Sequence, residues 1–165
     1  MRDFSPVYDL PNSPAVYAFF SKGRRGSYVA YVGIAGRLKQ RITQHLIRRD
    51  SSVATGTSAV NLNPDFVSSI SWWEHTDFDK TVYLKAAEMV AFEVLNPALR
   101  SRGAVDNAGM DLFNDEGFNT KFKELFEGEP TGSIEFPSLT DAMEKISTLE
   151  EKVHKLEELI QKLKK

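Results

Sequence analysis

The chain has 165 residues, of which 41% are hydrophobic and 27% are charged, and its formal net charge at pH 7 is −2. This length suits one modest domain with an appendage. The slight negative charge argues against nucleic-acid binding through bulk positive charge. The lack of cysteine excludes disulfides, thiolate metal sites and cysteine nucleophiles. No apolar run approaches the ~18 residues of a membrane span, and residues 1–6 lack the layout of a signal peptide, so we expect a cytoplasmic protein.

The first predicted elements are two strands joined in a hairpin. Residues 16–20 and 27–32 are short β-rich runs, and the basic, Gly-punctuated segment 21–26 between them is typical of a turn. Gly33 and Gly36 then break the second run. The sequence therefore predicts an antiparallel strand pair that ends before residue 36.

Two helices and a third strand follow. From residue 38 to residue 49, apolar side chains recur at helical spacing on one face. Residues 51–64 are rich in Ser, Thr, Gly and Asn and predict a loop, and residues 66–74 form a third β-rich run. Asp79 is a reasonable N-cap for a second helix with a wide apolar stripe, which Asn96-Pro97 ends.

The composition of the chain changes near residue 127. Residues 98–110 look irregular, and residues 113–126 predict a third helix. The Gly- and Pro-containing stretch that follows is typical of a linker. We therefore expect an α+β domain over residues 1–127, a linker over 128–137 and a separate helix over 138–165.

The predicted C-terminal helix has the heptad pattern of a coiled coil. Apolar residues recur in alternating steps of three and four from Leu139 to Leu163, without an intervening Gly, Pro or aromatic residue. β-Branched residues at most a positions and leucine at most d positions favour a parallel two-stranded coil. We expect homodimer contacts from Ile146, Leu149, Val153, Leu156, Ile160 and Leu163. A single helix that folds back on its own domain is the alternative.

Basic residues concentrate in the first third of the chain. Every charged residue from Lys22 to Arg49 is basic, whereas the acids gather after Asp111. Such a cluster can bind nucleic acid despite the negative net charge, because affinity depends on the phosphates that are contacted. The candidate phosphate ligands are Arg24, Arg25, Arg37, Lys39, Arg48 and, later in the chain, Arg100.

A second pattern combines two tyrosines with single basic and acidic residues. Tyr17 lies in the first predicted strand, and Tyr31 begins a Tyr-Val-Gly run at the end of the second. Arg41 follows Tyr31 by ten positions, and His45 lies one helical turn later. Glu88 lies among apolar neighbours on the second predicted helix, where a charge is costly unless it meets a cation.

The order and spacing of these residues, including Glu88 nine positions before Pro97, resemble the GIY-YIG nuclease family over about residues 14–100. The resemblance implies a small antiparallel three-stranded sheet flanked by helices. It also implies DNA as the partner and one Mg²⁺ or Mn²⁺ ion bound by Glu88. The implied catalytic set is Tyr17, Tyr31, Arg41, His45 and Glu88.

The first functional hypothesis is therefore an endonuclease that hydrolyses DNA phosphodiester bonds, one strand per active site. Arg41 would clamp the phosphate with fixed donors. A tyrosine can accept the proton of the attacking water only as phenolate, so Arg41 and the metal would have to lower its pKa from ~10. The sequence does not rank Tyr17 and Tyr31 for this role.

The chain also departs from the pattern of this family. Ala15 stands where the family name has glycine, Ile34 where many members carry a lysine or another polar residue, and Arg100 where many carry an asparagine. These departures keep a second hypothesis open, a catalytically weak nucleic-acid-binding or scaffold module that dimerises through its tail. A third is a metal-free protein-interaction domain.

Overall fold

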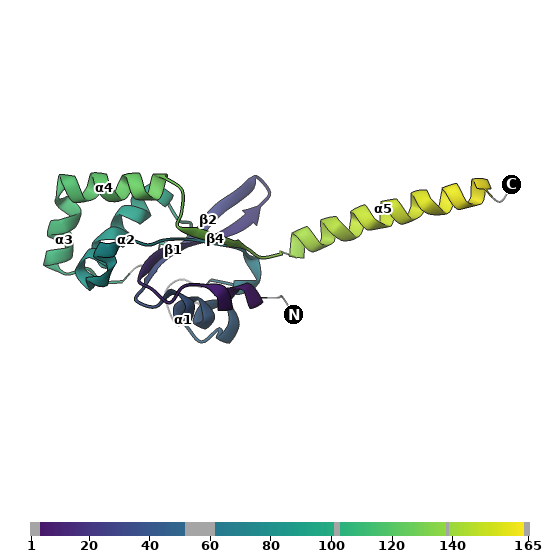
Figure 1. The fold of residues 1–165 in the computed structure, drawn as a ribbon. Helices are drawn as coiled ribbons and strands as arrows, with labels where there is room; N and C mark the ends of the chain where they lie inside the picture. Colours follow the sequence, from purple (N-terminus) through teal and green to yellow (C-terminus); the bar gives the residue numbers. More distant parts are fainter. Residues whose placement is uncertain (1–3, 52–61, 101–102, 138, 164–165) are drawn as a thin grey trace.

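The computed structural model describes residues 4–51, 62–100, 103–137 and 139–163. It is an α+β fold built on one antiparallel sheet with the strand order β2-β1-β3-β4 (Figure 1). The strands are β1 (Ala15–Gly23), β2 (Gly26–Ala35), β3 (Val67–Trp73) and β4 (Gly132–Glu135). The helices are α1 (Leu38–Ile42), α2 (Thr81–Leu95), α3 (Asn107–Asn114), α4 (Glu116–Glu127) and α5 (Leu139–Leu163). Single 3₁₀ turns cover Ser5–Asp9, Pro64–Phe66 and Thr76–Asp79.

The predicted three-stranded sheet is wrong by one strand. Strand β4 pairs with β3 inside the segment that was expected to be a linker, and Trp72 lies opposite Gly132 in the ladder. A Cβ atom on Gly132 would come within 2.2 Å of the Trp72 ring, so the glycine lets the indole cross the edge strand. A four-residue strand with little apolar content gives almost no sequence signal, because its pairing depends on a partner about sixty residues away.

The sheet separates two apolar layers because successive strand residues point to opposite faces. Tyr17, Phe19 and Tyr31 pack on the face that α1 covers. On the other face, Val16 and Val32 join the layer of α2 and α4. Figure 1 shows α1 on one side of the sheet and α2, α3 and α4 on the other.

The helix boundaries differ from those predicted in two places. Asp79 ends a 3₁₀ turn, and α2 begins at Thr81 instead of after an Asp79 cap. The predicted helix over 113–126 is two helices, because Asp115 leaves α3 and caps α4 by accepting a hydrogen bond from the Phe118 N–H. The predicted end of α2 is confirmed: Asn96 adopts the left-handed conformation with φ of 44°.

The helix that was predicted over residues 38–49 begins as α1 and continues as a π-helical segment, Thr43–Arg48. Arg49 ends it in the left-handed conformation, with φ of 56°. Most of the predicted loop over 51–64 lies outside the described residues. Helix α5 projects away from the sheet (Figure 1), and among the described residues no helix is both long and apolar enough to cross a membrane.

Candidate active site

The two tyrosines lie side by side on neighbouring strands, with their ring centroids 6.2 Å apart. Gly33, which pairs with Tyr17 across the ladder, makes room for both rings. A Cβ atom at this position would come within 2.6 Å of the Tyr17 hydroxyl and 2.9 Å of Tyr31 Cε1. The glycine of the Tyr-Val-Gly run is therefore required by packing, and it does not break the strand as predicted, because β2 continues through it to Ala35.

This packing gives a direct prediction for the folding of the site. Gly33→Ala is expected to lower the free energy of unfolding by about 1–3 kcal/mol, since buried rings must shift to admit the methyl group. Gly36→Ala is the matched control, because a Cβ atom there meets nothing within 4 Å. Urea unfolding of the two variants and the wild type measures the difference. Equal stabilities for the two variants would contradict the close packing at Gly33.

His45 connects Tyr17 to a serine that the sequence did not single out. The Tyr17 hydroxyl lies 2.8 Å from His45 Nε2, and the Ser51 hydroxyl lies 2.7 Å from His45 Nδ1. Burial, followed by the positive charge of Arg41, lowers the pKa of His45 to about 3. The imidazole is therefore neutral near pH 7 and has one donor and one acceptor nitrogen. One of the two hydroxyls donates a hydrogen bond to the ring, and the other accepts one from it. No motif marked Ser51, because its role arises from the π-helical turn that ends before it.

Arg41 lies where α1 passes the two tyrosines. Its guanidinium lies close enough to Tyr17 to lower the pKa of that phenol, and it donates a hydrogen bond to Gln44 Oε1 at 3.4 Å. Beside it is an open depression of about 410 Å³, which Arg37, Gln40 and the backbone around Gly36 also line. The lining contains two arginines, two glutamines and no acid, so it favours an anionic group.

Glu88 reaches this group from α2 and is only 3% exposed. The chain after α2 is tied to β2 by hydrogen bonds from the Ala98 and Leu99 N–H groups to the Val29 and Ala30 carbonyls, both 2.9 Å. The carboxylate lies close enough to raise the pKa of both tyrosines. The structure therefore brings together all five predicted catalytic residues.

Burial dominates the acidity of the two phenols. It raises the pKa of Tyr17 well above its usual value, with a further contribution from Tyr31, and it raises the pKa of Tyr31 with a contribution from Glu88. Arg41 acts to lower both pKa values, as the base hypothesis requires, but burial outweighs it and both pKa values are raised. Both phenols are therefore protonated at neutral pH.

The donor set fits one particular class of metal site. Among the described residues, no three His, Asp or Glu side chains gather as metal ligands. A single carboxylate such as Glu88 suits Mg²⁺ or Mn²⁺, since Mg²⁺ keeps several waters and is often held by one or two carboxylates plus a substrate phosphate.

The basic cluster separates into two groups at opposite ends of the hairpin. Arg24 and Arg25 form the turn between β1 and β2, whereas Arg37 follows the far end of β2. The ladder between these ends has eight steps, or roughly 26 Å at ~3.3 Å per residue. Lys39 and Arg48 lie on the α1 side with Arg37.

The structure also places two of the residues that depart from the pattern of the GIY-YIG nuclease family. Ile34 lines the depression beside Arg41. Arg100 lies elsewhere: it is hydrogen-bonded to Asn96 and lines a separate depression of about 290 Å³ with Glu93. Arg100 is therefore the candidate phosphate ligand that the structure places apart from Arg41 and from the hairpin turn.

No protein-family model, curated protein or solved structure matches the chain. A functional assignment therefore depends on the chemistry of the five clustered side chains and on their order in the sequence.

Proposed function

We propose that this protein is a divalent-metal-dependent endonuclease that hydrolyses DNA phosphodiester bonds, one strand per active site. The observation that carries the proposal is the convergence of Tyr17, Tyr31, Arg41, His45 and Glu88 beside an open depression without acids. Phosphodiester hydrolysis requires an activated water, compensation of charge on the phosphoryl oxygens and stabilisation of the leaving oxygen. This set contains a candidate group for each requirement.

Arg41 is the residue that would hold the reacting phosphate. Its guanidinium lies between the buried tyrosines and the open depression, so it can contact a phosphate that enters from solvent. Arg37 and Gln40 line the same depression and add donors. Fixed donors aimed at the position of developing charge stabilise a transition state because they need no reorganisation during the reaction.

Glu88 is the residue that would hold the metal. Bound there, Mg²⁺ or Mn²⁺ would supply Lewis-acid stabilisation to the phosphate and the leaving oxygen. The carboxylate is only 3% exposed and lies close enough to Tyr17 and Tyr31 to raise the pKa of both, which supports its membership of the proposed catalytic set.

Tyr17 and His45 would control the proton of the attacking water. The Tyr17 hydroxyl can pass its proton to His45 Nε2 over 2.8 Å, and Ser51 holds the other ring nitrogen. Burial and, after it, the positive charge of Arg41 oppose this transfer by lowering the pKa of His45. A phosphate bound to Arg41 would offset the smaller of these two contributions and would leave the contribution of burial unchanged. Tyr31, whose ring centroid lies 6.2 Å from that of Tyr17, is the alternative base.

A nicking assay on supercoiled plasmid tests the proposal. We expect conversion to nicked circles with Mg²⁺ or Mn²⁺ and none with EDTA. DNA binding without cleavage in either metal would instead support the second candidate, a catalytically weak nucleic-acid-binding module. Ile34 favours that candidate, because an apolar side chain lies beside Arg41 where a lysine would add a phosphate contact.

The separation of the basic groups predicts unequal effects on DNA binding. Arg37→Glu with Lys39→Glu is expected to weaken binding strongly and to lower the log–log salt slope by ~0.9 for each lost phosphate contact. Arg24→Glu with Arg25→Glu makes the same charge change at the far end of the hairpin, so we expect a smaller effect. Fluorescence anisotropy at several salt concentrations measures both. Equal losses would mean that the duplex follows the whole hairpin, and a larger loss from the turn pair would move the DNA path away from Arg41.

A further inference from the structure

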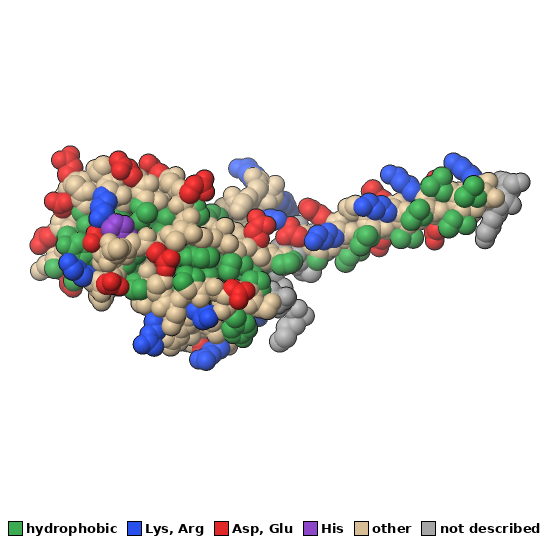
Figure 2. Space-filling view, viewed as in Figure 1, with side chains coloured by type: hydrophobic (Ala, Val, Ile, Leu, Met, Phe, Trp, Pro, Cys, Tyr) green, Lys and Arg blue, Asp and Glu red, His purple; other side chains and the backbone are tan. Residues whose placement is uncertain are grey.

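Helix α5 carries a continuous apolar stripe that its own domain does not cover. Eight large apolar side chains on this helix are between 51% and 86% exposed. They are Met143, Ile146, Leu149, Val153, Leu156, Leu159, Ile160 and Leu163. Figure 2 shows apolar side chains following one side of the projecting helix, with charged side chains on the other. An exposed apolar surface of this length marks an interaction site.

We propose that this stripe pairs with the same stripe of a second copy of the chain, in a parallel two-stranded coiled coil. The helix has 25 residues, or about 37 Å of length at 1.5 Å per residue. Its a positions include Ile146, Val153 and Ile160, and its d positions include Leu149 and Leu156. This combination favours two strands over three or four.

The charges that flank the seam select the parallel direction. Lys145 and Lys152 occupy g positions, and Glu150 and Glu157 occupy the e positions that follow. In a parallel dimer each g residue meets the next e residue of the other helix, so each lysine meets a glutamate. In an antiparallel dimer g meets g and e meets e, which brings lysines together and glutamates together. Exposed pairs contribute little stability, but they discriminate between orientations.

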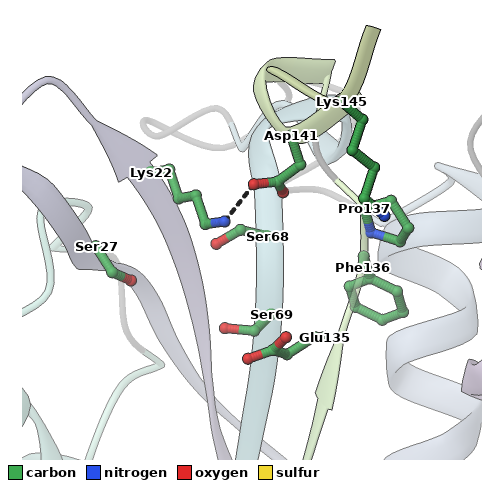
Figure 3. Close-up of a pocket in the computed structure, with 9 residues that line it drawn as sticks. All are labelled: Lys22, Ser27, Ser68, Ser69, Glu135, Phe136, Pro137, Asp141 and Lys145. Carbon is green, nitrogen blue, oxygen red and sulfur yellow. Dashed lines mark hydrogen bonds and ion pairs between the residues drawn. The ribbon is translucent and has the colours of Figure 1, made fainter. Parts of the chain in front are cut away.

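The junction between the sheet and α5 disfavours the alternative in which the helix folds back on its own domain. The Phe136 N–H donates a hydrogen bond to the Ser68 carbonyl at 2.7 Å, and the buried Phe136 ring packs edge-to-face on Phe4 with centroids 5.2 Å apart. Lys22 of β1 is paired with Asp141 in the first turn of α5 (Figure 3). The Phe136 contacts hold the chain against the sheet just before α5, and a fold-back would have to break the Lys22–Asp141 contact of its first turn.

A parallel coil places both sheet domains at the same end of the assembly. Part of the segment that was expected to be a linker, Gly132–Glu135, pairs with β3 as strand β4. The two domains would therefore be held side by side at a short distance. If the proposed nuclease activity is correct, two sites that each nick one strand would act on one duplex from this arrangement.

Mass measurement on the full chain tests the pairing without reference to catalysis. At micromolar concentration, light scattering is expected to give twice the 18.6 kDa mass of one chain. Ile146→Asp with Val153→Asp places charges in the seam and should return the mass to that of a monomer. Ser147→Asp with His154→Asp is the matched control one position along the helix, and it should remain dimeric. A monomeric wild type, or a dimeric seam variant, would overturn the proposal.

Cross-linking tests the direction, because the chain has no cysteine of its own. In a parallel dimer the two Ala142 residues face one another at a d position, so Ala142→Cys should give a disulfide-linked dimer under mild oxidation. In an antiparallel dimer the two positions would lie on the order of 30 Å apart. Glu144→Cys, at the outer f position of the same turn, should stay uncross-linked. Cross-linking of Glu144→Cys alone, or of neither variant, would overturn the parallel arrangement.

Discussion

Replacement of Glu88 by glutamine is expected to abolish metal-dependent DNA cleavage while the protein stays folded and binds DNA. Glutamine keeps the size and one acceptor oxygen of the side chain but removes the charge that would hold the cation. Loss of a metal that contributes several kcal/mol to the transition state corresponds to a drop in turnover of about a thousand-fold or more.

Glu93→Gln is the matched control on the same helix. Glu93 is exposed to solvent and lies 3.7 Å from Lys123 on α4, which is a surface contact of small energetic value. We expect wild-type turnover from this variant in the plasmid assay. Titration of Mg²⁺ separates a weakened metal site from a damaged fold, and circular dichroism checks the fold directly. Wild-type cleavage by Glu88→Gln would show that this carboxylate is not the metal ligand.

Arg41→Ala is expected to have the second largest effect, a fall in turnover on the order of 10²–10³-fold. The guanidinium lies close enough to Tyr17 to lower its pKa, and Arg41 also lines the depression, so its loss would remove charge compensation at the reacting phosphate. DNA affinity should fall far less, because many other phosphate contacts remain. Single-turnover rates at saturating protein separate the chemical step from binding.

Arg48→Ala controls for the loss of one positive charge from the same stretch of helix. Arg48 is exposed and is absent from the lining of the depression, so we expect a change in binding only. Arg41→Lys adds a second control, since it keeps the charge but loses the planar fork. Equal turnover for Arg41→Ala and Arg48→Ala would show that Arg41 acts only through general attraction of DNA.

The sequence by itself determined the local elements and the residues with which the site is built. The two runs around Tyr17 and Tyr31 paired as a hairpin because turn chemistry and strand propensity act over neighbouring residues. The end of α2 followed from Asn96-Pro97 for the same reason. The exposed stripe on α5 was also readable, because heptad spacing places apolar residues on one face wherever a helix forms.

Only the tertiary structure decided which of these residues act together and with what acidity. Strand β4 was missed because its pairing with β3 joins segments that are distant in the chain, and no local pattern specifies such a contact. The path of the backbone brought Ser51 into the site. It also separated the basic cluster into two groups, although the residues of the cluster are close in sequence. The pKa values of Tyr17, Tyr31 and His45 shifted chiefly through burial. Burial depends on everything packed around a side chain, so spacing along the chain cannot supply it.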